Sequence, residues 1–122
     1  MSKKSEEFFK TMLELLPSTN CKYRESIEYY GELLEITIIE EIFMPAIIKL
    51  LHEHKNIKQL ENIFNYFEDV STCDDGHLLN IFSVGALEVL GNDRAIVKIA
   101  QNFMGPKTTQ LQIEADRSLG RI

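Results

Sequence analysis

Apolar side chains recur at intervals of three and four residues along most of the chain, and this spacing constrains the fold more than any other feature. The strongest stripe is formed by Ile39, Ile42, Phe43, Ala46, Ile47, Leu50 and Leu51. Such spacing places the side chains on one face of an α-helix, whereas a half-buried strand would require strict alternation. No alternating run is bounded by turn residues, so the sequence predicts an all-α fold without β-hairpins.

Turn residues and prolines divide the stripes into six or seven short helices. The first helix begins near Ser5 and stops before Pro17, and a second stripe runs from Tyr23 to Leu34. Pro45 is expected either to kink the third helix or to lie in the first turn of a new one. Short connections predict antiparallel neighbours. A HEAT-like α/α solenoid and a compact irregular bundle both remain open, because no repeat of fixed period is visible.

The 122 residues, 44% of them hydrophobic, suit a single helical domain over residues 1–122. No apolar run approaches the roughly 20 residues that span a bilayer, and the charged first residues differ from a signal peptide. Cys21 and Cys73 are expected to be free, partly buried thiols. We therefore expect a cytoplasmic protein that does not bind a membrane.

The formal net charge of −6 is distributed unevenly. Between Glu25 and Asp93 there are 14 acidic residues and three lysines, whereas the two flanks together hold 5 acids and 10 bases. Phosphate binding requires clustered Lys and Arg, so this distribution argues against a nucleic-acid ligand. An acidic middle favours a basic protein partner, although the same charges also keep a protein soluble.

The stretch "EDVSTCDDGHLL", residues 68–79, combines four acids with Cys73 and His77. Thr72 and Asp75 fit the S/T-x-x-D/E capping box, which would make the stretch a joint between two helices. A metal site would need further ligands at suitable spacing, and a Cys–His nucleophile would need a third, orienting group. We therefore expect no metal, no cofactor and no enzyme; a small hydrolase using Cys73 and His77 is the least favoured function.

Two segments carry a resemblance to a known group of proteins. "FEDVSTCDDGHLLNIFSVGALEVLGND" and "AQNFMGPKTTQLQIEADRSLGR" resemble small all-helical bacterial proteins, some of which are similar to immunity proteins of polymorphic or contact-dependent growth-inhibition toxins. The matching positions are Phe67-Glu68-Asp69, Asp74-Asp75, Leu87-Glu88, Leu90-Gly91 and Met104-Gly105-Pro106. The resemblance covers about half of the chain and implies a binding protein, although similarity of fold does not fix function.

The resemblance and the acidic middle together predict an immunity protein that neutralises a cognate toxin, a basic nuclease domain, by occluding its active site. It would be a monomer when free and a heterodimer with the toxin. The alternative is a non-catalytic helical adaptor or scaffold that binds another bacterial protein. Short-looped packing is expected to bring the partner-binding residues onto one rim; they are Glu32, Glu35, Tyr66, Glu68, Asp69, Asp74, Asp75 and Asp93.

Two further positions stand out from the helical pattern. Tyr29 lies off the main stripes beside acids, as Tyr66 does, and tyrosines in such places anchor interfaces. Gly85 lies within a helix of otherwise good helix formers, where it costs about 1 kcal/mol relative to Ala. This glycine therefore predicts the close approach of a neighbouring helix.

Overall fold

Seven helical segments follow one another along the chain, as the apolar stripes predict. The computed structural model describes residues 1–122, and it contains helices and no strand. The elements are α1 (Lys3–Leu15), the 3₁₀ turn η1 (Pro17–Thr19), α2 (Asn20–Tyr30), α3 (Glu35–Ile38), η2 (Ile39–Phe43), α4 (Met44–Glu53), α5 (Ile57–Ser71), α6 (Gly76–Phe82), η3 (Ser83–Leu87), α7 (Glu88–Leu90), α8 (Arg94–Gln101) and α9 (Pro106–Ser118). The all-α fold is confirmed.

The helix boundaries follow local chemistry. Ser2 caps α1 by accepting a hydrogen bond from the Ser5 amide at 3.1 Å, and α1 ends before Pro17 as predicted. Gly31, with φ of +74°, closes α2 in the left-handed conformation. The second apolar stripe is therefore shorter than predicted, because this turn places Leu33 and Leu34 in the connection to α3.

Two of the segments are continuous helices interrupted by a π-helical turn. In η2 the Met44 amide donates to the Ile39 carbonyl, five residues back, immediately before Pro45, which has no amide to donate. The other π-helical turn, η3, contains Gly85 and packs directly on η2. A Cβ atom at Gly85 would lie 2.9 Å from both Cβ and Cγ2 of Ile39. The close approach predicted at Gly85 is confirmed.

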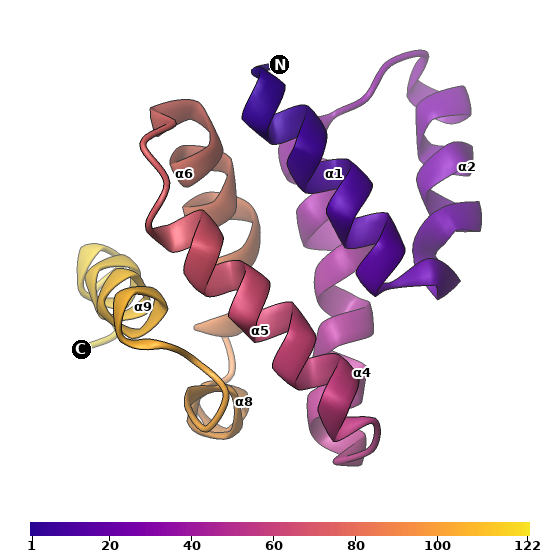
Figure 1. The fold of residues 1–122 in the computed structure, drawn as a ribbon. Coiled ribbons are helices and arrows are strands. Elements are labelled where there is room, and N and C mark those ends of the chain that lie inside the picture. Colours follow the sequence, from indigo (N-terminus) through magenta and orange to yellow (C-terminus); the bar gives the residue numbers. More distant parts are fainter.

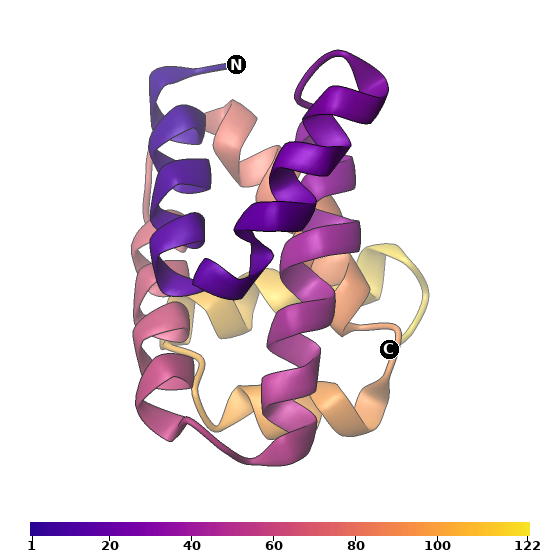
Figure 2. The same cartoon turned by 90° about the vertical axis from the view of Figure 1, so that its right-hand side faces the viewer.

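The helices share one hydrophobic core of 26 buried residues. Its largest side chains are phenylalanines in edge-on contact: the Phe67 and Phe82 rings lie 5.0 Å apart, and the Phe8 and Phe82 rings lie 6.4 Å apart. Contacts also join elements that are distant in the chain, since α1 packs on α5 and α6, α8 on α4, and α9 on α5 and η3. These contacts fit the compact bundle (Figures 1 and 2). A HEAT-like solenoid is not confirmed.

The arrangement brings several helix ends together. In Figures 1 and 2 the first turns of α1 and α6 lie at the upper end of the molecule, where the connection from α2 to α3 also lies. The α8 helix lies at the lower end, and α2 forms an outer flank.

None of the helices combines the length and the apolar character that crossing a membrane requires.

Candidate functional site

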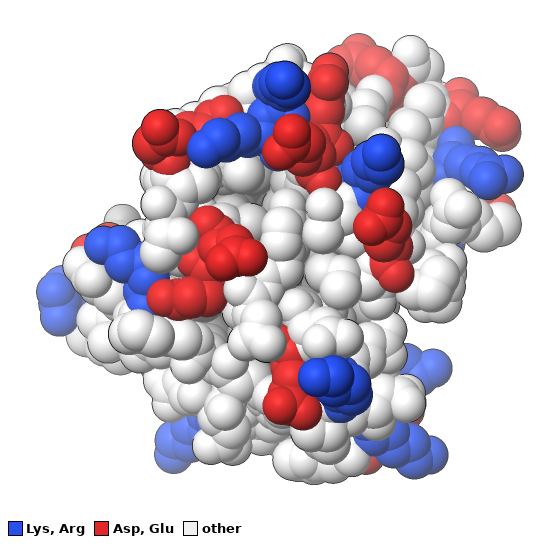
Figure 3. All heavy atoms as spheres, in the orientation of Figure 1, with Lys and Arg blue, Asp and Glu red and all other residues white.

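Most of the predicted site residues lie at the upper end of the molecule, near the starts of α1, α3 and α6. We call this surface the acidic end; its carboxylates belong to Glu6, Glu7, Glu32, Glu35, Asp69, Asp74 and Asp75. Carboxylates are favoured near helix N-termini, where the helix dipole is positive. Lys3 and Lys4 lie among them, and Figure 3 shows acidic and basic side chains together along the upper edge of the molecule.

Direct contacts link the elements of the acidic end. Lys4 Nζ lies 2.8 Å from Asp74 Oδ1, which joins α1 to the connection between α5 and α6. His77 Nε2 lies 2.9 Å from Glu35 Oε1, which joins α6 to α3. A hollow of about 160 Å³ is lined by Lys4, Glu7, Tyr66, Asp69, Val70, Cys73 and Leu78. The structure thus gathers Glu35, Tyr66, Asp69, Asp74 and Asp75, with exposed Glu32 three residues before Glu35.

Two adjacent aspartates of the acidic end have different surroundings. The hydrogen bond from Lys4, and then its positive charge, hold the pKa of Asp74 below its usual range. The Asp74 side chain is 92% exposed, so water screens this pair and it contributes little to stability. The Leu78 amide, which donates to Asp75 Oδ1 at 3.0 Å, and then the Ser2 hydroxyl, lower the pKa of Asp75. Both carboxylates are therefore charged at neutral pH.

The predicted capping box at Thr72 is wrong, because Asp75 is the N-cap of α6. The helix α5 extends to Ser71, so Thr72 is its C-cap and its hydroxyl donates backward to the Asp69 carbonyl at 3.0 Å. The next helix begins only at Gly76. The acids of "STCDDG" therefore follow one helix and precede another, and only Asp75 has a capping role.

Glu68 does not belong to the acidic end, although Asp69 does. Adjacent residues of a helix point about 100° apart, and Glu68 faces α9. Its carboxylate accepts hydrogen bonds from the amides of Lys107 and Thr108, at 3.0 and 2.9 Å, and from the Thr108 hydroxyl at 3.0 Å. A Cβ atom at Gly105 would lie 2.5 Å from Glu68 Cδ, so the glycine makes room for this contact. The "FED" and "MGP" segments thus form the joint between α5 and α9.

The Glu68 joint is expected to make stability depend on acid pH. Burial alone would raise the pKa of Glu68, but the hydrogen bonds from Thr108 and Lys107 and the Lys107 charge outweigh it, so the pKa is lowered. A lowered pKa stabilises the fold above the pKa of the unfolded chain, and this contribution is lost as pH falls through the folded-state pKa. Glu68→Gln should cost about 1 to 2 kcal/mol at pH 7 and much less near pH 3.

Urea unfolding at both pH values measures this difference. Glu61→Gln, at an exposed position of the same helix, is the matched control and should behave like the wild type at both values. An equal loss of stability for Glu68→Gln at pH 7 and pH 3 would contradict the proposed role of the charged carboxylate.

Asp93 lies away from the other predicted acids, so its assignment to the same rim is wrong. Its carboxylate caps α8 by accepting hydrogen bonds from the amides of Ala95 and Ile96, at 3.0 and 3.3 Å. The continuous helix from Gly76 to Leu90 carries the chain about 22 Å from Asp75 before α8 begins. Sequence reasoning placed Asp93 with the rim because it treated all helix-end acids alike.

Tyr66 and Cys73 are partly buried, whereas Cys21 is exposed. The Tyr66 ring stacks on Phe8 with centroids 6.0 Å apart, and burial raises the pKa of its phenol. Cys73 is half-buried and Cys21 is exposed, and both are free thiols. The expected partial burial therefore holds for Cys73 and is wrong for Cys21, which lies on the outer face of α2 with Sγ 3.5 Å from Glu25 Oε1.

No three side chains of His, Cys, Asp or Glu come together in a way that would hold a metal ion. Sequence reasoning did not anticipate the partner of His77, whose ring bonds Glu35. A hollow of about 350 Å³ beside this pair is lined by Leu34, Glu35, Ile36, Thr37, His77, Asn80 and Ile81. Because Glu35 lies 42 residues away in the chain, no local motif marks the pair.

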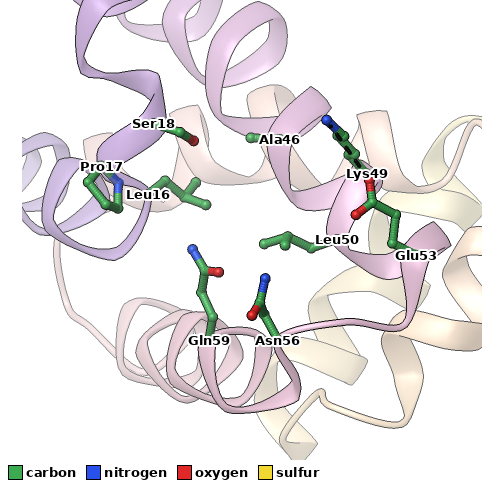
Figure 4. Close-up of a pocket in the computed structure, with 9 residues that line it drawn as sticks. All are labelled: Leu16, Pro17, Ser18, Ala46, Lys49, Leu50, Glu53, Asn56 and Gln59. Carbon is green, nitrogen blue, oxygen red and sulfur yellow. Dashed lines mark ion pairs between the residues drawn. The ribbon is translucent and has the colours of Figure 1, made fainter.

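A third hollow, of about 320 Å³, lies between η1, α4 and the start of α5 (Figure 4). Its lining residues are Leu16, Pro17, Ser18, Ala46, Lys49, Leu50, Glu53, Asn56 and Gln59. Gln59 Nε2 donates to the Leu15 carbonyl at 3.0 Å, and Lys49 Nζ lies 3.9 Å from Glu53 Oε1. Lys49 and Glu53 give this hollow charges of opposite sign, so it lacks the concentration of carboxylates that distinguishes the acidic end.

Comparison with protein-family models matches residues 9–120 to a domain of unknown function, DUF7674. The chain belongs to this family. No curated protein and no solved structure matches it. The matched residues include about half of α1 and all of the later helices. The Glu68 joint therefore lies within the DUF7674 domain, and so does the acidic end apart from Glu6 and Glu7.

The DUF7674 domain also contains a buried charged group that sequence reasoning missed. Asp116, on α9, is 2% exposed, and its carboxylate accepts hydrogen bonds from Arg94 Nη1 at 2.9 Å and from Gln112 Nε2 at 3.1 Å. Arg121 Nη1 lies 3.7 Å from the same carboxylate and donates to the Glu88 carbonyl at 2.8 Å. We call Arg94, Gln112, Asp116 and Arg121 the Asp116 network.

The Asp116 network accounts for another segment of the resemblance. A Cβ atom at Gly91 would overlap the Asp116 carboxylate and the Arg121 guanidinium, so the "LE-L-G" segment ends on a glycine that makes room for this network. Gly91 is the sequence signal that points to a close contact here, although it does not reveal the contact's partner. Gly91, Glu68 and Gly105 all form joints of the DUF7674 fold, and they identify a fold more directly than an activity.

Proposed function

We propose that this DUF7674 domain is an immunity protein that binds a basic toxin domain through the acidic end and occludes the toxin's active site. The observation that carries the proposal is the acidic end itself, where seven carboxylates from several elements lie among only two lysines. A nuclease that binds phosphate needs a basic cleft, and an acidic surface complements it. The protein acts in the cytoplasm, as a monomer when free and as a heterodimer with the toxin.

The arrangement of the joints supports this proposal. Asp75 fixes the start of α6 and Glu35 bonds His77 on that helix, so rigid elements hold these two carboxylates in place. Asp69 and Glu32 are exposed and have no ion-pair partner. Pre-positioned surface charge accelerates encounter with an oppositely charged partner. The resemblance of residues 67–93 and 100–121 to small all-helical bacterial proteins, some of which are similar to immunity proteins, also supports the proposal.

Co-expression with the domain encoded by the adjacent reading frame tests the immunity proposal. That domain alone is expected to arrest growth, and the DUF7674 chain is expected to restore growth and to co-purify with it. Growth arrest that persists despite co-expression would overturn the proposal. The alternative function, a helical adaptor, would then be favoured if the chain instead co-purified with a non-toxic protein.

Charge reversal at the acidic end is expected to slow association with the toxin domain. The triple variant Glu32→Lys, Asp69→Lys and Asp74→Lys changes exposed residues and spares the Asp75 cap. Association should slow by about ten-fold or more in dilute buffer, and the difference should shrink as salt reduces the Debye length to about 8 Å. Stopped-flow mixing at two salt concentrations measures both effects.

A matched triple variant separates local charge from net charge. Glu53→Lys, Glu61→Lys and Glu114→Lys change the net charge by the same amount at exposed positions on α4, α5 and α9, outside the acidic end. This control should slow association much less. Equal slowing by the two triple variants would show that the acidic end is not the contact surface.

A further inference from the structure

The helix α2 presents an outer face that no other part of the chain covers. None of its residues is fully buried, and it contacts the core through the half-buried side chains of Tyr23 and Ile27. Figures 1 and 2 show α2 on the flank of the bundle. A helix of 11 residues is only marginally stable in water by itself, so a partner that covers this face would also stabilise it.

Two adjacent tyrosines lie exposed at the end of α2. The side chain of Tyr29 is 83% exposed and that of Tyr30 is 48% exposed, the highest values among the aromatic residues of the chain. Their rings meet edge to face, with centroids 4.9 Å apart and planes at 86°. Tyrosine is enriched at interface hot spots because it offers a large, rigid contact area. The pair therefore forms an exposed aromatic surface.

The charges around the tyrosines are mainly negative. Glu25 lies one helical turn before Tyr29, Glu28 adjoins it, and Glu32 follows Gly31 at the end of the helix. None of the three carboxylates forms an ion pair within the chain. The basic residues of α2, Lys22 and Arg24, belong to its first half. The surface thus combines exposed aromatic faces with carboxylates that form no ion pair.

We propose that this surface, the aromatic flank, binds an arginine-rich segment of the basic partner. The aromatic flank consists of Glu25, Glu28, Tyr29, Tyr30 and Glu32. A guanidinium group stacks on the face of a tyrosine ring and forms paired hydrogen bonds with a carboxylate, so both components of the flank suit arginine. The inference rests on the proposed function for the basic character of the partner. It extends the contact surface from the acidic end, through Glu32, onto α2.

Titration with a nona-arginine peptide, followed by ¹H–¹⁵N NMR in dilute buffer, tests the aromatic flank without the toxin. Amide shifts are expected at the end of α2, and a nona-lysine peptide should bind more weakly. Tyr29→Ala should weaken arginine binding about two- to five-fold, the value that an exposed cation–π contact implies. Tyr29→Phe keeps the ring and should bind like the wild type. Ile113→Ala, which removes another exposed apolar side chain, is the control and should have no effect.

Three outcomes would overturn the inference: amide shifts that leave α2 unaffected, equal affinity of Tyr29→Ala and wild type, or equal binding of the two peptides. Misfolding does not confuse the result, because Tyr29 makes little contact with the core and its replacement should leave stability nearly unchanged. The co-expression growth assay tests the proposed function separately. Protection from the toxin without shifts on α2 would overturn only the aromatic flank, whereas persistent growth arrest would overturn the proposed function.

Discussion

Replacing both Arg94 and Arg121 by methionine is expected to lower the free energy of unfolding by about 3 to 5 kcal/mol. Asp116 is 2% exposed, and these two guanidinium groups are the cations beside its carboxylate. Without them the carboxylate would keep only the Gln112 amide as a side-chain donor, and an unpaired buried charge is costly. Methionine retains most of the alkyl packing of arginine, so the loss reports on the charges together with the Arg121 hydrogen bonds to the Glu88 carbonyl and the Asn92 side chain. Urea unfolding at pH 7 measures it.

The substitution Asp116→Asn should have opposite effects in the two backgrounds. In the double methionine variant it removes the buried charge and should recover at least half of the lost stability. In the wild type it removes the partner of two guanidinium groups whose side chains are 47% and 23% exposed, and it should cost about 1 to 3 kcal/mol. If Asp116→Asn destabilises both backgrounds equally, the carboxylate charge is not what the arginines stabilise.

The Asp116 network also shows why sequence patterns predict one part of this fold better than another. Periodicity identifies the face of a helix by its apolar residues. Leu111, Ala115 and Leu119 have the spacing of one helical face, and of these Ala115 is buried whereas Leu119 is exposed. Asp116 is adjacent to Ala115 and buried as well, because α8, the segment after α9 and the end of α7 converge on it. Burial of a charged side chain depends on partners supplied by other elements, and no local pattern contains that information.

The candidate site shows the same limit. Glu35, Asp69, Asp74 and Asp75 lie near one another as expected, because short connections return the chain to the same end of the bundle. The sequence groups Glu68 with them as a neighbour of Asp69, but the rotation per helical residue turns it toward α9. Sequence reasoning could predict which acids lie near helix ends. It could not predict which way each carboxylate points.

The two π-helical turns were likewise invisible in the sequence. A π-helical turn leaves the apolar stripes on either side of it intact, so periodicity does not distinguish it from a regular helix. The sequence does contain the two residues that accompany these turns, Pro45 beside η2 and Gly85 within η3. Gly85 predicted a close neighbour, and only the structure identifies this neighbour as Ile39.

Gly85→Val is expected to lower the free energy of unfolding by about 2 to 3 kcal/mol, the upper range for overpacking a core. The Cβ atom alone would lie 2.9 Å from two atoms of Ile39, and both helices are held by other core contacts that limit how far they can separate. Valine favours a helix more than glycine does, so helix propensity opposes this loss. Gly76→Val, where a Cβ atom meets nothing within 4 Å, is the matched control and should change stability little.

A double-mutant cycle with Ile39→Ala isolates the contact between the two π-helical turns. Removing the Ile39 branches makes room for the methyl groups of the introduced valine, so the double variant should be at least about 1 kcal/mol more stable than the sum of the single losses predicts. Strict additivity would show that the surrounding structure relaxes to accommodate the valine.

The contact between the two π-helical turns also holds α3 against α6. Glu35 lies at the start of α3, and His77, its partner, lies at the start of α6. Gly85→Val should therefore shift the His77 ring resonances in NMR spectra, whereas Gly85→Ala, with its smaller side chain, should shift them less.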